Sequence, residues 1–201
     1  MAAAFFYGTL IHPEILKRVI GNAGSHLSIC PALLLDHTRH QITASNCDYP
    51  GVVPYSQSRV MFDRELSLEE RSVRGVLVIG LSDEDVRLLD IFEGNEYTRE
   101  LVSVHPLGPF LQLNDMPPVE MDSLVPATLP PIPPPNELAE PREANTYIWC
   151  CPLTQLRPSL WTFEDFVKHS AWKWVGTGSD GNKDYAEVDR RRAMDGIIVQ
   201  S

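Results

Sequence analysis

Proline is concentrated in one part of this 201-residue chain, and that concentration limits the folds open to it. Eleven of the 17 prolines lie between Pro106 and Pro141, and residues 130–135 alone contain five of them. Proline lacks a backbone N–H and fixes φ, so this segment cannot form a central strand or a helix interior. We therefore expect residues 106–143 to be a solvated excursion with polyproline character, with recognition by a partner protein as the alternative.

On either side of this segment the sequence predicts mainly strands. Runs rich in apolar, β-branched or aromatic residues, typical of buried strands, lie at residues 4–7, 32–35, 73–81, 96–106 and 145–151.

Helices are fewer, and they do not alternate regularly with the strands. Residues 13–20 begin with a proline and are followed by a glycine, and residues 83–93 follow a serine that fits an N-cap and also precede a glycine. A third helix is expected around residues 162–169, where apolar residues recur at helical spacing. This element order favours an α+β fold with a mixed or mostly antiparallel sheet.

Charge and composition exclude several classes of protein. The formal net charge is −10, and the single basic cluster, at residues 190–192, lies beside acidic residues, so we expect no nucleic-acid-binding surface. No stretch approaches the roughly 18 apolar residues of a membrane span, and the N-terminus lacks the basic and apolar regions of a signal peptide. We expect a soluble protein that does not bind membranes.

The cysteines and histidines do not form a recognisable metal site. The four cysteines, two of them adjacent at positions 150 and 151, include no C-x-x-C pair, and the six histidines lack zinc-ligand spacing. We therefore expect no metal, reduced thiols and a cytoplasmic location.

Glu93 is the strongest candidate for a catalytic group. It follows Leu89 by four residues and Val86 by seven, so it lies on or beside the apolar stripe of its helix, near the negative end of the helix dipole. Partial burial and that dipole would raise its proton affinity, which suits a general base near neutral pH. The alternative is an exposed glutamate at a helix end, and the spacing leaves both open.

Five different short motifs follow one another along the chain. They are F-F-Y-G-T-L at residues 5–10 followed by H-P-E-I-L at 12–16, Y-P-G-V-V-P at 49–54, V-R-G-V-L at 73–77, L-D-I-F-E-G-N-E-Y-T-R at 89–99 and Y-I-W at 147–149. Each is short, but together they resemble the γ-glutamylcyclotransferase-like (AIG2-like) family.

This resemblance implies a small mixed β-barrel with flanking helices and a pocket between the Y-G-T-L loop and a catalytic glutamate. By position, Glu93 would be the general acid/base. The substrate-binding residues would be Tyr7, Gly8, Thr9, Leu10 and Tyr97. The implied reaction converts a γ-glutamyl amine or amino acid into 5-oxoproline and a free amine, with no metal or organic cofactor.

The chain also departs from the family pattern. The family's arginine-rich turn is only partly kept, with Arg39, and the Pro-rich segment is longer than a usual hairpin. We expect a cyclotransferase-like domain at residues 1–155 and a helical extension packed on it at residues 156–201. The alternatives are a non-catalytic binding or partner-recruiting protein on the same fold, or an enzyme for a specialised γ-glutamyl conjugate.

Overall fold

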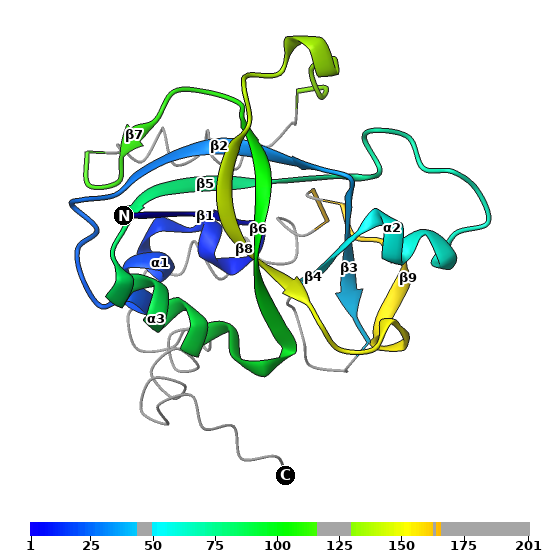
Figure 1. Cartoon of the computed structure of the whole chain (residues 1–201), viewed down its shortest axis with the longest axis horizontal. Helices are drawn as coiled ribbons and strands as arrows, with labels where there is room; N and C mark the ends of the chain where they lie inside the picture. The colour runs from blue at the N-terminus through cyan, green and yellow to red at the C-terminus, as the bar shows by residue number, and fades with distance from the viewer. Residues whose placement is uncertain (44–49, 116–129, 163, 166–201) are drawn as a thin grey trace.

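The computed structural model describes residues 1–43, 50–115, 130–162 and 164–165. At its centre, five of the described strands, spread over residues 2–149, form a closed barrel (Figure 1). They are β1 (Ala2–Phe6), β2 (Ser28–Leu35), β5 (Ser72–Leu81), β6 (Tyr97–Pro106) and β8 (Arg142–Trp149). Their order is β5-β1-β8-β6-β2, and β2 pairs with β5 to close the barrel. The predicted α+β fold with a mixed barrel is confirmed.

The barrel is mixed because one pair of neighbouring strands is parallel. β1 and β8 run parallel, with Ala4 opposite Asn145, whereas the other barrel pairs are antiparallel. The hydroxyl of Thr146 strengthens this junction by donating to the carbonyl of Phe5 at 2.9 Å. β6 and β8 are also neighbours in the barrel, although the Pro-rich segment separates them in sequence.

Strand β1 is buried on both faces, which explains its continuous apolar run. Successive residues of a strand point to opposite faces, so Phe5 packs inside the barrel with Leu34 and Leu77. Phe6 points outward and packs with residues of α1 (Pro13–Ile20), including Leu16. The first strand therefore joins the interior of the barrel to its helical cover.

Helix α1 and helix α3 (Asp83–Glu93) lie together over the outside of the barrel (Figure 1). Both end as the sequence predicts. Gly21 ends α1 in the left-handed region at φ 69°, and Gly94 ends α3 at φ 72°. Ser82 caps α3 in a capping box with Asp85, as expected for its position before an acidic first turn.

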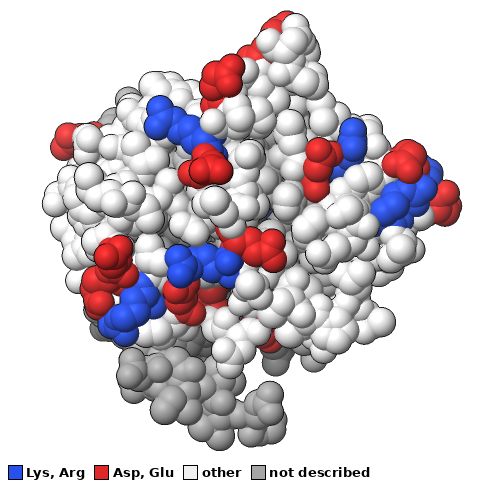
Figure 2. Space-filling model, in the orientation of Figure 1, with Lys and Arg blue, Asp and Glu red and all other residues white. Residues whose placement is uncertain are grey.

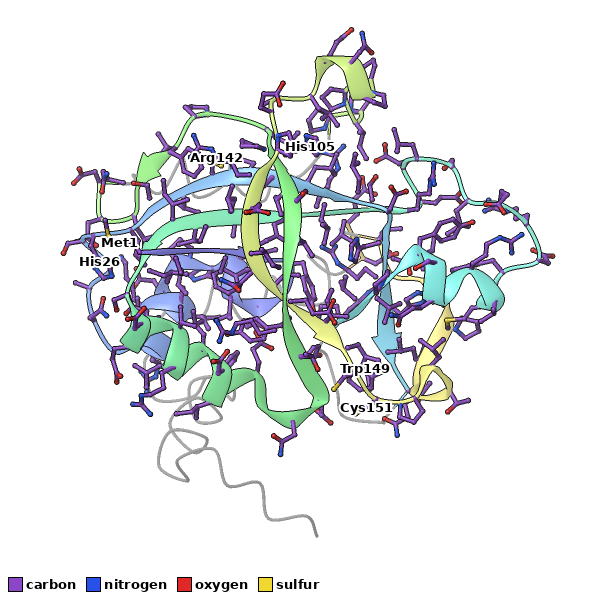
Figure 3. The ribbon with its side chains drawn as sticks, viewed as in Figure 1. Met1, His26, His105, Arg142, Trp149 and Cys151 are labelled. Carbon is purple, nitrogen blue, oxygen red and sulfur yellow. The ribbon has the colours of Figure 1, made fainter. Side chains whose placement is uncertain are left out.

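A second sheet of three strands lies beside the barrel and was not foreseen in full (Figure 1). Its order is β4 (Pro50–Pro54), β3 (His37–Ile42) and β9 (Leu156–Leu160), and α2 (Tyr55–Ser58) follows β4. Trp149, at the end of β8, points toward this sheet and packs in one cluster with Leu156 (Figure 3).

The chain after residue 155 begins with strand β9 instead of a helix. Of the helix expected around residues 162–169, the structure describes residues 162, 164 and 165, and 164 and 165 are helical; the rest lies outside the described residues. The division at residue 155 stays a prediction. The Pro-rich segment between β6 and β8 is not solvated throughout, contrary to the expectation from its prolines: its short strand β7 (Leu111–Gln112) pairs with β2, and the apolar side chain of Leu113 is buried in the core. The part around residues 135–137 projects beyond the barrel (Figure 1). Short 3-10 turns complete the fold: η1 (Thr9–Ile11), η2 (Arg59–Met61), η3 (Gly94–Glu96), η4 (Pro135–Glu137) and η5 (Leu153–Gln155).

The charged residues on the visible face form small groups of mixed sign. Figure 2 shows basic side chains beside acidic ones over this face. Within the described residues, no helix is both long enough and apolar enough to cross a membrane.

Candidate active site

A small pocket of about 50 Å³ opens where the loop after β1 faces the end of α3. One water molecule needs about 10–15 Å³ by the same measure, so this pocket has room for a small polar group. The pocket is open to solvent. Its lining comes from β1 and the following loop, β4, the end of α3, the start of β6, and β8. The lining residues are Phe5, Phe6, Tyr7, Gly8, Thr9, Leu10, Pro50, Phe92, Glu93, Glu96, Tyr97 and Tyr147.

All six residues that the sequence singled out line this one pocket. Glu93 reaches it from the end of α3, Tyr97 from the start of β6, and the other four from the loop after β1. Their positions agree with the arrangement that the family resemblance implied. Their roles stay predictions.

The loop after β1 turns sharply into η1 and then into α1. Its backbone bonds run from Ile11 N–H to the Gly8 carbonyl and from His12 N–H to the Thr9 carbonyl. The N–H groups of Thr9 and Leu10 come before these donors, so they have no acceptor within the turn. Gly8 also lets the loop approach β4, because an added Cβ would lie 3.3 Å from the Pro50 ring.

Helix α3 brings Glu93 to the pocket by its register. Leu89, one turn earlier, is fully buried in the core beneath the helix, and Glu93 on the same side is half-buried. This confirms that Glu93 lies beside the apolar stripe of the helix. As the last residue of α3, it also sits at the negative end of the helix dipole.

Two buried tyrosines respond to the charge of Glu93. The Tyr7 hydroxyl donates to the carbonyl of Tyr147, and burial, followed by the negative charge of Glu93, raises the pKa of Tyr7 well above its usual value. Burial, followed by the charges of Asp90 and Glu93, also raises the pKa of Tyr147. Both hydroxyls are therefore protonated near neutral pH and can act as hydrogen-bond donors.

Tyr97 joins two walls of the pocket. Its hydroxyl donates to the Pro50 carbonyl at 3.1 Å, and its ring packs edge-on against Trp149 with the ring centres 5.6 Å apart. The start of β6 is therefore tied to β4 across the pocket, which is consistent with the predicted role of Tyr97 in closing it.

Sequence reasoning missed a polar network beside Glu93. The Asp90 carboxylate accepts from the Tyr147 hydroxyl at 2.9 Å and pairs with Arg99 Nε at 3.0 Å. All three residues lie within the motifs at 89–99 and 147–149, so the signal was present. The face to which Tyr147 points could not be read from the sequence, because β8 is buried on both faces from Thr146 to Trp149.

Glu96 and Pro50 were also missed as pocket residues. Glu96 is exposed and brings a second carboxylate to the lining. Among the described residues, no group of three or more histidine, cysteine or acidic side chains is placed to hold a metal ion.

Comparison of the sequence with known protein families identifies the family of this chain. The sequence model of the family described as "Gamma-glutamyl cyclotransferase, AIG2-like" matches residues 4–111. The chain belongs to this family. The match includes the loop after β1, α3 and Tyr97, and thus all six predicted site residues, although it ends before β8.

Individual relatives are distant. Protein AIG2 C of Arabidopsis thaliana is 23% identical over 173 residues, which cover 86% of this chain and 76% of that protein. A solution structure of an Arabidopsis thaliana protein has a TM-score of 0.50 at 18% identity, covering 96% of this chain and 82% of that one. A crystal structure of a yeast γ-glutamyl cyclotransferase specific to glutathione also has a TM-score of 0.50 at 18% identity, with 96% and 86% covered. At these identities the two structures support the fold alone.

Proposed function

We propose that this protein is a cofactor-independent γ-glutamyl cyclotransferase with Glu93 as its general acid/base. The observation that carries the proposal is the position of Glu93, half-buried in the pocket that the loop after β1 also lines. Membership of the γ-glutamyl cyclotransferase, AIG2-like family supports it.

The proposed reaction takes place within one substrate molecule. The α-amine nitrogen attacks the γ-carbonyl carbon, a new C–N bond closes the five-membered ring, and the bond to the leaving nitrogen breaks. Glu93 takes one proton from the α-ammonium and later delivers it to the leaving nitrogen, so it ends in its starting state. The second proton that the attacking nitrogen loses as the ring amide forms passes through solvent to the released amine. Because both reacting groups belong to one molecule, the enzyme mainly holds the substrate folded and moves protons.

The loop residues supply the groups that would hold the substrate. The N–H groups of Thr9 and Leu10, which have no acceptor within their turn, would bind the α-carboxylate or the oxyanion that forms on the γ-carbonyl. Tyr7 and Tyr97 would form the walls around the γ-glutamyl group, since both line the pocket and are fixed by hydrogen bonds to backbone carbonyls.

The charge of the pocket favours some leaving groups over others. Glu96 adds an exposed carboxylate to the lining, and the chain carries a formal net charge of −10. An anionic leaving group would be repelled, so we propose γ-glutamyl amines as better substrates than γ-glutamyl peptides with a free carboxylate.

The decisive experiment measures 5-oxoproline release from a panel of γ-glutamyl amines, amino acids and peptides. Glu93→Gln is expected to lower kcat by at least about 100-fold, which is the smaller end of what general acid/base catalysis contributes. Glu96→Gln is the matched control, because it removes the other glutamate of the pocket lining. It is expected to keep turnover and to improve the use of substrates with anionic leaving groups.

Undiminished activity in Glu93→Gln would refute its role. A folded wild type that releases no 5-oxoproline from any substrate, yet binds γ-glutamyl compounds, would favour a non-catalytic binding protein.

We also propose a cytosolic location, because Cys30, Cys150 and Cys151 are free thiols. Microscopy of the tagged protein tests that location.

A further inference from the structure

A second cavity, of about 520 Å³, is distinct from the pocket that holds Glu93. It opens where the turn before β5 and strand β3 meet the Pro-rich segment and the end of β9. None of its lining residues belongs to the first pocket. Its volume falls in the range of cavities that bind small organic molecules.

Two nearly buried arginines line this cavity. Arg39 of β3 is 5% exposed and Arg74 of β5 is 9% exposed. Arg39 Nη2 donates to the carbonyl of Arg74, and Arg74 Nη2 donates to the carbonyl of Pro130. These carbonyl oxygens fix the direction of the guanidinium groups, and the neutral Pro130 carbonyl does not balance the charge of Arg74.

The positive charge is costly where it lies. Burial lowers the pKa of Arg39 to about 9, although the nearby Tyr7 acts in the opposite direction. Arg74 has an ion pair with Glu69, but the distance from Nη2 to Oε1 is 3.6 Å and the Glu69 side chain is 58% exposed. Such a pair contributes little to offset a buried charge.

Arg74 also has an unused donor. Its Nε is buried and has no hydrogen-bond partner within the described part of the chain. A buried donor without an acceptor is unfavourable, and a guanidinium is shaped to bind a carboxylate through two parallel hydrogen bonds. Arg74 therefore fits a planar anion.

The remaining walls define the rest of the ligand. Trp161, Leu160 and the adjacent prolines Pro130 and Pro131 supply apolar surface. Acidic side chains, Glu69, Glu70 and Glu164, also line the cavity. Carboxylates so close to the arginines disfavour a multiply charged anion such as phosphate, whereas a single negative charge on an apolar body matches both features.

We propose that this cavity is a binding site for a small organic monocarboxylate. Its carboxylate pairs with Arg39 and Arg74, and its apolar body lies against Trp161 and the two prolines. The site is separate from the proposed cyclisation chemistry, so its test does not depend on enzymatic activity.

Isothermal titration calorimetry of the full chain tests this site, with benzoate and phenylacetate as probes and inorganic phosphate as a competing anion. We expect the carboxylates to bind and phosphate to bind more weakly. Arg74→Met is expected to weaken benzoate binding at least about tenfold, because it removes charge-assisted hydrogen bonds. Arg87→Met, which removes an exposed arginine of α3, is the matched control and should leave binding unchanged.

Two further variants keep the result decisive. Arg74→Lys retains the charge but loses the planar fork, so it should also weaken benzoate binding. It provides the test if Arg74→Met does not fold. Glu93→Gln alters only the first pocket and should bind benzoate as the wild type does. No binding of either carboxylate, unchanged binding in folded Arg74→Lys, loss of binding in Glu93→Gln, or tighter binding of phosphate would each overturn the proposal.

Discussion

The attachment of α3 at its N-terminus should depend on Asp85, whose side chain is 1% exposed. Its carboxylate accepts from the Ser82 backbone N–H at 2.9 Å and from three side-chain donors, each at 2.8 Å: the Ser82 hydroxyl, Asn22 Nδ2 and His26 Nε2. Asn22 and His26 follow α1, so this one carboxylate joins the end of α1 to the start of α3. Asp85→Ala would remove all four contacts and leave the Ser82 N–H without its acceptor.

The expected loss of stability can be worked out from these contacts. A lost cap costs about 1 kcal/mol, and a hydrogen bond to a charged group contributes about 1.5–3 kcal/mol. Because Asn22 and His26 are partly exposed and can turn to water, we expect a total of about 3 kcal/mol. For a chain of this size, that corresponds to a fall in Tm of roughly 6–12 °C.

Thermal and urea unfolding followed by circular dichroism at pH 7 measures this loss. Asp83→Ala is the matched control, because it removes an exposed carboxylate from the same first turn and should cost only about 0.3–1 kcal/mol. Equal losses in the two variants would refute the argument that burial and hydrogen bonding make Asp85 special.

The effect also has an expected pH dependence. Burial alone would raise the pKa of Asp85, but hydrogen bonds from His26, Ser82 and Asn22 outweigh it and hold the pKa below the usual value of 3.8. The stabilisation is therefore fully present above pH 3.8 and is lost as the pH falls through the lower pKa of the folded state. The difference between wild type and Asp85→Ala should stay constant from pH 7 to about pH 5 and shrink in stronger acid.

Three further predictions concern the barrel and its second sheet. Gly75→Ala should destabilise the fold by about 3 kcal/mol in urea unfolding, because the new methyl would lie 2.1 Å from the Phe6 carbonyl oxygen; an unchanged midpoint would contradict this close approach. Tyr147→Phe should cost about 2 kcal/mol in the same assay through loss of the bond to Asp90, and a neutral effect would show that water replaces it. Burial lowers the pKa of His40 although backbone hydrogen bonds oppose this, so the unfolded state takes up a proton first and stability should fall as the pH drops below 6.5, by at most about 1.4 kcal/mol per pH unit. His40→Gln should show a shallower fall in unfolding titrations, and an identical slope would exclude His40 as a source.

Local sequence signals were sufficient for the elements that frame the pocket. The helices α1 and α3 have a proline or a capping serine at one end and a glycine at the other, and these act within a few residues of each other. The apolar, β-branched run that predicts strand β5 is also a signal among neighbouring residues. The register of α3 then placed Glu93 beside the apolar stripe before any tertiary contact was known.

The second sheet was less visible because two of its strands, β3 and β9, lack the usual apolar pattern. Strand β3 is largely polar, yet Thr38, Arg39 and His40 are buried in it. The side chains of Thr38 and His40 are satisfied by partners that only the folded chain supplies, such as the Arg157 carbonyl, which accepts from His40 at 2.9 Å. Strand β9 contains Pro158, which is tolerated because β9 lies at the edge of its sheet.

By itself, the sequence determined the boundaries of α1 and α3, the main barrel strands, and the motifs by which the chain resembles its family. Only the tertiary structure decided how strands far apart in sequence close the barrel, since Tyr7 donates to the carbonyl of a residue 140 positions away. The same closure places Asp90 beside Tyr147, and Arg39 and Arg74 on one cavity. The physical reason is that propensity and capping act over a few residues, whereas strand pairing and buried charge depend on neighbours that the linear order does not specify.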